Sequence, residues 1–245
     1  MTLIKYSALV SDQRGKLNGS IFSKNRAGAI VKNFAKPKNP KTGFQKTNRI
    51  SWQYLIKEYS LLNVDEQSTW INAARDITWY NKVGNPYHPT GQLLYLSCNQ
   101  NLSLIGISPV STFVSHASAP VITSASIADF YAGDTSMVVD KVLTGDKTDW
   151  YALIYATKSL SRGIHYAYKY FRFVKFFYTN IHSTWQIYAD YINRFGAPVV
   201  DKKLFFKIRL VNSINGMAGQ DYYFNIPIYN DGIGTLIIGT SVFVY

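Results

Sequence analysis

The chain has 245 residues, a hydrophobic fraction of 47% and a formal net charge of +12, which predicts a globular protein of one or two domains and excludes a disordered chain. The single cysteine, Cys98, excludes an internal disulfide framework, and the four scattered histidines offer no zinc-ligand spacing. Charged residues make up only 16% and aromatic residues another 16%, a balance that favours extensive contact with other proteins.

The N-terminus shows neither export nor membrane signals. Its sequence MTLIKYSALVSDQRG has one lysine and a short apolar run, so we expect no signal peptide. No apolar run along the chain approaches the roughly 18 residues of a membrane span. We therefore expect the protein to be made in a cytoplasm and to have no membrane partner.

The positive charge is concentrated at the start of the chain. Residues 1–50 carry 11 Lys and Arg against Asp12 alone, so this fifth of the chain holds +10 of the net charge. A basic arm of this kind predicts an anionic partner, either nucleic acid or an acidic protein surface. The bases expected to make the contact are Arg14, Lys16, Lys24, Arg26, Lys32, Lys36, Lys38 and Lys41.

This arm, residues 1–44, has its own structural signals. Residues 20–24 and 29–34 are typical of short strands, and the Asn25-Arg-Ala-Gly28 sequence between them predicts the turn of a hairpin. Residues 36–41 are expected to be extended, because Pro37 and Pro40 disfavour helix in the residues before them. We expect this last part to cross a surface as a strap.

Residues 45–104 predict a small helical unit. A broad apolar stripe indicates a helix over 45–62, and Asn63 with Glu66 forms a plausible capping box for a second helix that buries Trp70, Ile71 and Ala74. Thr90 can cap a third helix, in which Cys98 is expected to be a buried small hydrophobe. A helix-turn-helix that reads DNA is a less favoured alternative, because the region is slightly acidic.

Residues 105–120 are rich in Ser and have prolines near both ends, which predicts a linker. Residues 121–245 then read as β structure, with a short helix over 183–195 and a two-faced strand at 204–212. The expected fold is α+β, with an immunoglobulin- or fibronectin-like β-sandwich at the C-terminus. Its strands are predicted at 121–127, 136–143, 150–157, 165–173, 204–212, 222–228 and 235–245.

No constellation for catalysis is recognisable. The only glutamates are Glu58 and Glu66, and most aspartates sit in turn-like sequences. A metal site from Asp134, Asp146 or Asp231 is a much less favoured alternative to turns. Residues 232–239 have the wrong glycine spacing for a phosphate-binding loop. We therefore expect no enzyme activity, no cofactor, no metal and no small-molecule substrate.

Residues 165–178 interleave bases with aromatic side chains. Such a face can stack the bases of single-stranded nucleic acid, but packing of the aromatics within a sandwich strand is favoured. An enriched aromatic face can also form a subunit interface. The candidate interface aromatics are Tyr166, Tyr168 and Tyr170.

Several segments resemble a family of tailed-bacteriophage proteins. The N-terminal resemblance covers residues 14–28, RGKLNGSIFSKNRAG, and the strap KPKNPKT at 36–42. It continues in WINAA at 70–74, GQLLYLSCNQN at 91–101 and YINRFG at 191–196. This family is encoded near capsid genes, so the resemblance implies a structural role in the virion, most plausibly that of an accessory capsid protein.

The favoured hypothesis is an auxiliary, cement or decoration protein that binds the lattice of the major capsid protein through the basic arm. The first alternative is a component of the portal vertex, head–tail connector or tail. The second is a nucleic-acid-binding protein that uses the same arm, and contact with packaged DNA is compatible with either virion role. The expected location is the virion, assembled in the cytoplasm of the bacterial host.

Overall fold

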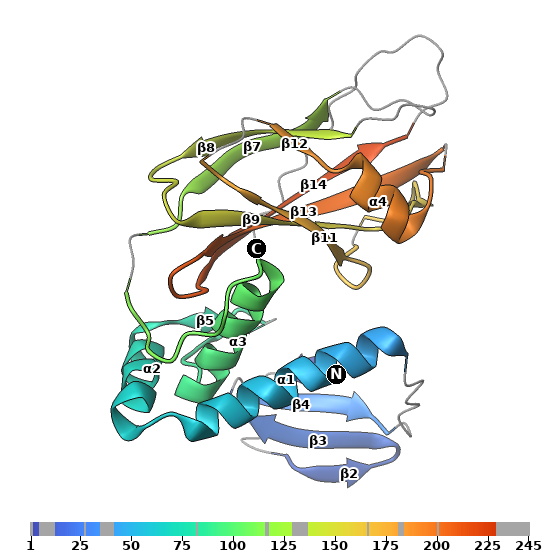
Figure 1. Cartoon of the computed structure of the whole chain (residues 1–245). Coiled ribbons are helices and arrows are strands. Elements are labelled where there is room, and N and C mark those ends of the chain that lie inside the picture. The colour runs from blue at the N-terminus through green and yellow to red at the C-terminus, as the bar shows by residue number, and fades with distance from the viewer. Residues whose placement is uncertain are drawn as a thin grey trace. The chain divides into compact units, whose positions relative to one another are not determined.

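The computed structural model describes residues 2–4, 13–26, 28–34, 42–81, 83–115, 118–128, 137–165, 167–180, 184–199 and 201–228. These residues form a mixed structure of four helices and several antiparallel sheets (Figure 1), which confirms the α+β class. The chain divides into two compact units: unit 1 comprises Met1–Gln100 and Val110–Ser115, and unit 2 comprises Asn101–Pro109 and His116–Tyr245.

Unit 1 begins with a four-stranded antiparallel sheet. Its strands are β1 (Thr2–Ile4), β2 (Gly15–Leu17), β3 (Ser20–Asn25) and β4 (Gly28–Asn33), in the order β1-β4-β3-β2. Asn18 and Gly19 connect β2 to β3, both with positive φ (42° and 82°). This two-residue turn matches the right-handed twist of the strands, which favours Asn-Gly at these positions.

Two helices and most of a third complete unit 1: α1 (Gly43–Leu61), α2 (Val64–Asp76) and α3 (Gly91–Leu104), which passes into unit 2 at Asn101. The short strands β5 (Trp79–Tyr80) and β6 (Pro86–Tyr87) lie between α2 and α3 in the sequence. The predicted capping box is confirmed, because the Glu66 N–H donates to Asn63 and the Asn63 N–H donates to the Glu66 carboxylate. Thr90 accepts the Leu93 N–H at 3.1 Å, as the sequence indicated.

The predicted burial in α2 is only partly correct. Trp70 and Ala74 are buried, and the Trp70 ring packs edge-on against Tyr95. Ile71 is 40% exposed, contrary to expectation. It lies against Gly91, where an added Cβ would come within 2.9 Å of the Ile71 backbone nitrogen. Gly91 therefore permits this close approach, but it has no side chain with which to cover Ile71.

Unit 2 contains a five-stranded and a three-stranded antiparallel sheet, seen as two layers in Figure 1. One sheet pairs β13 (Lys202–Asn212) with β14 (Ala218–Pro227), β9 (Trp150–Ala156) and β10 (Leu160–Ser161), and β9 with β11 (Arg172–Tyr178). The other has the order β12-β8-β7, with bounds Thr184–Gln186, Val138–Thr144 and Val121–Ala128.

One hydrophobic core receives side chains from both sheets of unit 2. Val139 and Trp185 come from the three-stranded sheet, and Ile154, Phe206 and Ile208 come from the other. Along β13, Leu204, Phe206, Ile208 and Leu210 all belong to this core, whereas Lys207 and Arg209 lie on the opposite face. The predicted two-faced strand is therefore confirmed.

Two predicted elements, a strand and a helix, have other bounds in the structure. Residues 165–173 were expected to be a strand, but the strand is β11 at Arg172–Tyr178, and Tyr168–Tyr170 form a turn in which the Tyr170 N–H donates to Ala167 O. Residues 183–195 were expected to be helical, but Thr184–Gln186 form β12 and α4 spans only Tyr188–Phe195. The strand predicted at 235–245 lies outside the described residues.

Candidate basic interface

The sheet of unit 1 places two of the predicted binding bases on one face. Lys16 on β2 and Lys32 on β4 are both register partners of Ile21 on β3, so their side chains project from the same side. Both lysines are exposed. The Lys16 ammonium lies 4.1 Å from the centre of the half-exposed Phe34 ring, a cation–π contact. This face therefore combines positive charge with an aromatic surface.

The remaining predicted bases are distributed differently. Lys24 is the register partner of Ala29 and projects from the opposite face, Arg26 lies in the turn after β3, and Arg14 immediately precedes β2. Lys36, Lys38 and Lys41 lie outside the described residues. The described part of the arm thus gathers Lys16 and Lys32, but it does not bring all of the bases to one surface.

The candidate interface aromatics lie in a turn and not on a strand. Tyr168 and Tyr170 are 62% and 46% exposed, and the Lys169 ammonium lies 5.7 Å from the Tyr168 ring centre. Ala167, which immediately precedes Tyr168, is buried with Leu160 and Phe205 in a small hydrophobic cluster. This cluster anchors the turn. Tyr166 lies outside the described residues.

The helix α1 adds bases and apolar side chains that the sequence analysis did not assign to a site. Among the α1 residues whose burial the structure describes, only Leu55 is fully buried, and Tyr59 packs its ring against Tyr95 at 5.2 Å. Ile50, Tyr54 and Leu61 are 65%, 52% and 78% exposed. The signal was present in the sequence: apolar residues cover so wide an arc of this helix that one packing partner cannot bury them all.

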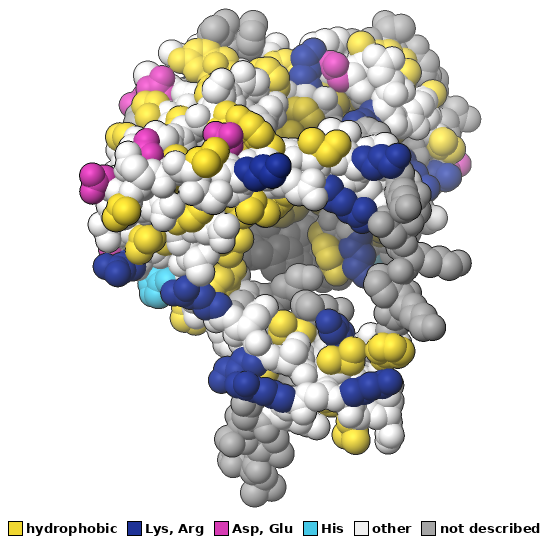
Figure 2. Space-filling view, turned by 60° about the horizontal axis from the view of Figure 1, so that its bottom comes forward, with side chains coloured by type: hydrophobic (Ala, Val, Ile, Leu, Met, Phe, Trp, Pro, Cys, Tyr) yellow, Lys and Arg dark blue, Asp and Glu magenta, His cyan; other side chains and the backbone are white. Residues whose placement is uncertain are grey.

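Positive charge continues through this region without interruption. From residue 13 to residue 57 the sequence contains 11 Lys and Arg and no Asp or Glu. Lys46 and Lys57 on α1 are exposed, like Lys16 and Lys32 on the sheet. On the face of the molecule drawn in Figure 2, dark-blue basic side chains repeatedly lie beside yellow hydrophobic ones. Such a mixed surface suits a partner that offers carboxylates and apolar contacts together.

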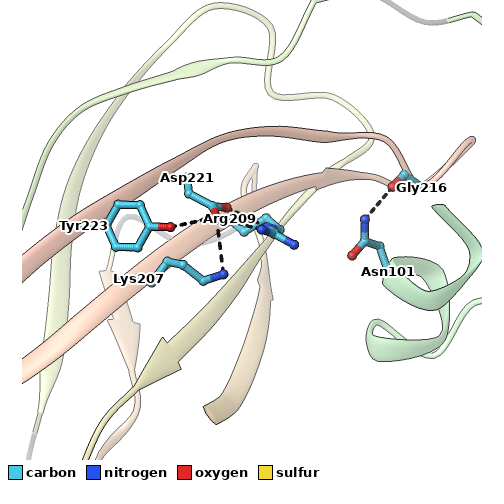
Figure 3. A network of polar contacts seen from close by, with 6 residues as sticks. All are labelled: Asn101, Lys207, Arg209, Gly216, Asp221 and Tyr223. Carbon is cyan, nitrogen blue, oxygen red and sulfur yellow. Dashed lines mark hydrogen bonds and ion pairs between the residues drawn. The ribbon is translucent and has the colours of Figure 1, made fainter. Parts of the chain in front are cut away.

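Unit 2 holds a charged network between β13 and β14, drawn in Figure 3. Arg209 donates two hydrogen bonds to the Asp221 carboxylate, at 2.6 and 2.7 Å. The same carboxylate accepts from the Tyr223 hydroxyl at 3.1 Å and pairs with the Lys207 ammonium at 3.4 Å. The Lys207 ammonium also lies 4.2 Å from the centre of the Tyr155 ring.

The electrostatics of this network indicate a structural role. Burial raises the pKa of Asp221, but hydrogen bonds and charge from Arg209, together with charge from Lys207, outweigh it and hold this pKa below its usual value. Burial and the charge of Arg209 lower the pKa of Lys207 against the opposing effect of Asp221. Arg209 and Asp221 are direct register partners, so the network ties the two strands together.

The described residues contain no cluster of three or more His, Cys, Asp or Glu side chains that could hold a metal ion. Cys98 is buried, and burial raises the pKa of its thiol to about 12, so it remains protonated at neutral pH. In the part of the chain that the structure describes, none of the helices has the length and apolar character needed to cross a membrane.

No family model matches its sequence, and no curated protein matches it significantly.

Proposed function

We propose that the protein is a structural, non-enzymatic component of a bacteriophage virion, an auxiliary or decoration protein that binds the lattice of the major capsid protein. It acts in the particle, where its basic N-terminal region is the attachment point and contact with packaged DNA is secondary. The observation that carries the proposal is the acid-free run of 11 bases from residue 13 to 57, which spans both a sheet and a helix with exposed lysines.

Attachment through a folded basic surface suits a repetitive acidic lattice. Each exposed lysine adds little by itself, but a shell offers many identical sites at high local concentration, so modest individual contacts give stable coverage. The resemblance to phage proteins in residues 14–28 and 36–42 supports the same role. The N-terminal region is proposed to act as an arm whose strands and strap lie on the lattice.

We further propose that the two sheets of unit 2 are an immunoglobulin- or fibronectin-like sandwich that decorates the particle. Their shared core, with Val139 and Trp185 facing Ile154 and Phe206, supports this architecture. A sandwich held by the basic region would project from the lattice or bridge neighbouring subunits.

Quantitative mass spectrometry of purified particles tests the proposed role, with the copy number scaled to the major capsid protein. Lattice binding predicts on the order of a hundred copies per particle, because each repeated lattice site offers the same contact. A count of about a dozen contradicts the decoration role and indicates a ring-shaped portal, connector or tail component. Complete absence from particles overturns any virion role.

Binding to free duplex DNA distinguishes a nucleic-acid-binding protein from a capsid-binding protein. A protein that neutralises several phosphates loses roughly a thousandfold or more in affinity between low and moderate salt. Tight, strongly salt-dependent DNA binding together with no binding to empty shells would make nucleic acid the primary partner.

A further inference from the structure

The outward face of α1 has an unusual mixture of side chains. Successive residues in a helix are rotated by about 100°, so Lys46, Ile50, Tyr54, Lys57 and Leu61 fall in one stripe along its length. All five are exposed. The opposite face contains Ser51, Leu55 and Tyr59, which contact the rest of unit 1. The helix therefore has one apolar face that is covered and a second, mixed face that is not.

The exposure of this second face is large for a helix of a soluble protein. Ile50 and Leu61 retain 65% and 78% of their accessible surface, and Tyr54 between them retains 52%. Isolated exposed apolar residues are ordinary, but a continuous row along one helix marks an interaction surface. The row has the spacing by which helices dock in grooves of other proteins.

We propose that this stripe, Lys46, Ile50, Tyr54, Lys57 and Leu61, is a docking helix that inserts into an apolar groove rimmed by carboxylates on the partner protein. This proposal rests on the proposed function and identifies the partner as the major capsid protein. Ile50, Tyr54 and Leu61 fill the groove, while Lys46 and Lys57 pair with the acidic rim. The charge of the surrounding region, with no acid from residue 13 to 57, selects an acidic partner.

Other occupants fit the stripe less well. A second copy of the chain would bring Lys46 and Lys57 against equally basic surfaces, which costs free energy. On a lipid surface, Lys46 and Lys57 would meet mobile headgroups in place of fixed carboxylates, and the vesicle measurement below distinguishes this case. Nucleic acid would pair with the lysines but would leave the exposed aliphatic side chains of Ile50 and Leu61 without an apolar partner.

The test measures binding of the full-length protein to empty shells assembled from the major capsid protein of the same virus. The variant I50S/L61S removes the apolar anchors at two highly exposed positions, and we expect at least about tenfold weaker binding. The matched control is V121S/V142S, which makes the same kind of change at exposed positions of unit 2 (58% and 53% exposed) and is expected to bind normally. Far-UV circular dichroism and thermal midpoints verify that both fold.

A second pair of variants tests the acidic rim. K46Q/K57Q is expected to weaken shell binding several-fold and to reduce its dependence on salt, whereas K158Q/K169Q, at exposed positions of unit 2, leaves both unchanged. Binding of the wild type and I50S/L61S to phosphatidylserine vesicles and to duplex DNA is measured in parallel. An I50S/L61S defect seen only with vesicles or DNA overturns the proposal.

The outcomes separate this inference from the function on which it rests. If the wild type binds shells and I50S/L61S binds them equally well, the docking helix is wrong and the proposed function stands. If the folded wild type does not bind shells at all, the proposed function and the docking helix both fall. Selective loss in I50S/L61S and K46Q/K57Q, with normal binding by both controls, supports the docking helix.

Discussion

Asn99 and Val110 are joined by two hydrogen bonds between a side chain and a backbone. The Val110 N–H donates to Asn99 Oδ1 at 2.7 Å, and Asn99 Nδ2 donates to the Val110 carbonyl at 3.4 Å. Asn99 is completely buried in α3, where Nδ2 also donates to the Tyr95 carbonyl at 3.1 Å. The side-chain amide of Asn99 therefore satisfies both backbone groups of Val110, as a neighbouring strand would, although the segment around Val110 is irregular.

Neighbouring contacts fasten the same segment to unit 1. The Trp70 indole N–H donates to the Ser111 carbonyl at 2.7 Å, and the Phe113 N–H donates to Thr69 at 3.0 Å. The Phe113 ring packs edge-on against Trp70. Residues 105–120, predicted as a linker, are thus divided, because residues 110–115 belong to unit 1.

We predict that Asn99→Leu destabilises unit 1 by about 1–3 kcal/mol, because it leaves the Val110 N–H without its buried acceptor. Denaturant unfolding followed by tryptophan fluorescence measures the change. Asn48→Leu is the control: Asn48 is exposed on α1, and its replacement should alter stability by less than about 0.5 kcal/mol. Equal effects of the two substitutions would show that the Asn99–Val110 pair contributes nothing specific.

Asp221→Asn is expected to destabilise unit 2 by about 3 kcal/mol, since it leaves Lys207 and Arg209 as neighbouring cations with little exposure to solvent. Asp201→Asn provides the matched control, because the Asp201 ion pair with Arg162 has side chains that are 75% and 49% exposed. Its loss should cost less than about 1 kcal/mol. Thermal and urea unfolding of both variants at neutral pH give the comparison.

Asp221 also predicts sensitivity to acid. Despite its burial, the hydrogen bonds and charges around it hold the pKa of Asp221 below the ordinary value of 3.8. The unfolded chain therefore binds more protons in acid, and the stability from this carboxylate is present above pH 3.8 and is lost as the pH falls through the lower folded pKa. The free energy of unfolding of Asp221→Asn should fall less steeply in acid than that of the wild type.

Local signals in the sequence were sufficient for much of unit 1. The capping box at Asn63 and Glu66 and the Thr90 cap involve residues three apart, so their chemistry is visible in the sequence alone. The Asn18-Gly19 turn between β2 and β3 carried an equally local signal, although no strand was predicted before it. Which apolar residues of α1 become buried depends on distant partners, and this explains why the exposure of Ile50 and Leu61 was missed.

In unit 2, the alternation of apolar and polar side chains correctly predicted β13. The run of aromatic and basic residues that predicted a strand at 165–173 misplaced β11. Aromatic residues and bases continue from residue 165 to 178, so the pattern cannot place the start of a strand within that run. The turn at Tyr168–Tyr170 is fixed by burial of Ala167 against Leu160 and Phe205. Likewise, the pairing of Arg209 with Asp221 follows from the register of β13 and β14, which depends on the turn that joins them.

Lys141 is expected to make stability rise in mild alkali. Burial, supported by the charge of Lys147 and opposed by that of Asp140, lowers the pKa of Lys141 from 10.5 to about 8. Between these values the unfolded chain holds a proton that the folded chain has released, so the contribution of this group to stability increases with pH. Lys141→Met should reduce that rise, measured as the free energy of unfolding at pH 7.5 and 9.5.

The control for this effect is Lys158→Met, which changes an exposed lysine of the same unit. It should retain the wild-type dependence on pH, because this substitution leaves Lys141 and its surroundings unchanged. A pH profile of Lys141→Met that coincides with those of the wild type and Lys158→Met would contradict the assignment.

The sheet of unit 1 offers a last test of the capsid-binding surface. Two double variants remove the same number of positive charges, but from different faces of the sheet. Lys16→Gln/Lys32→Gln removes the two bases that share a face with Ile21 and Phe34, whereas Lys24→Gln/Arg26→Gln removes two charges from the opposite face and the turn. If this face contacts the capsid lattice, the first variant binds empty shells several-fold more weakly than the second. Equal losses would indicate a response to net charge alone, because long-range attraction depends on the summed charge and is screened by salt. Repeating the comparison at low and moderate salt separates these cases, since a positional difference between the two variants persists when long-range attraction is screened.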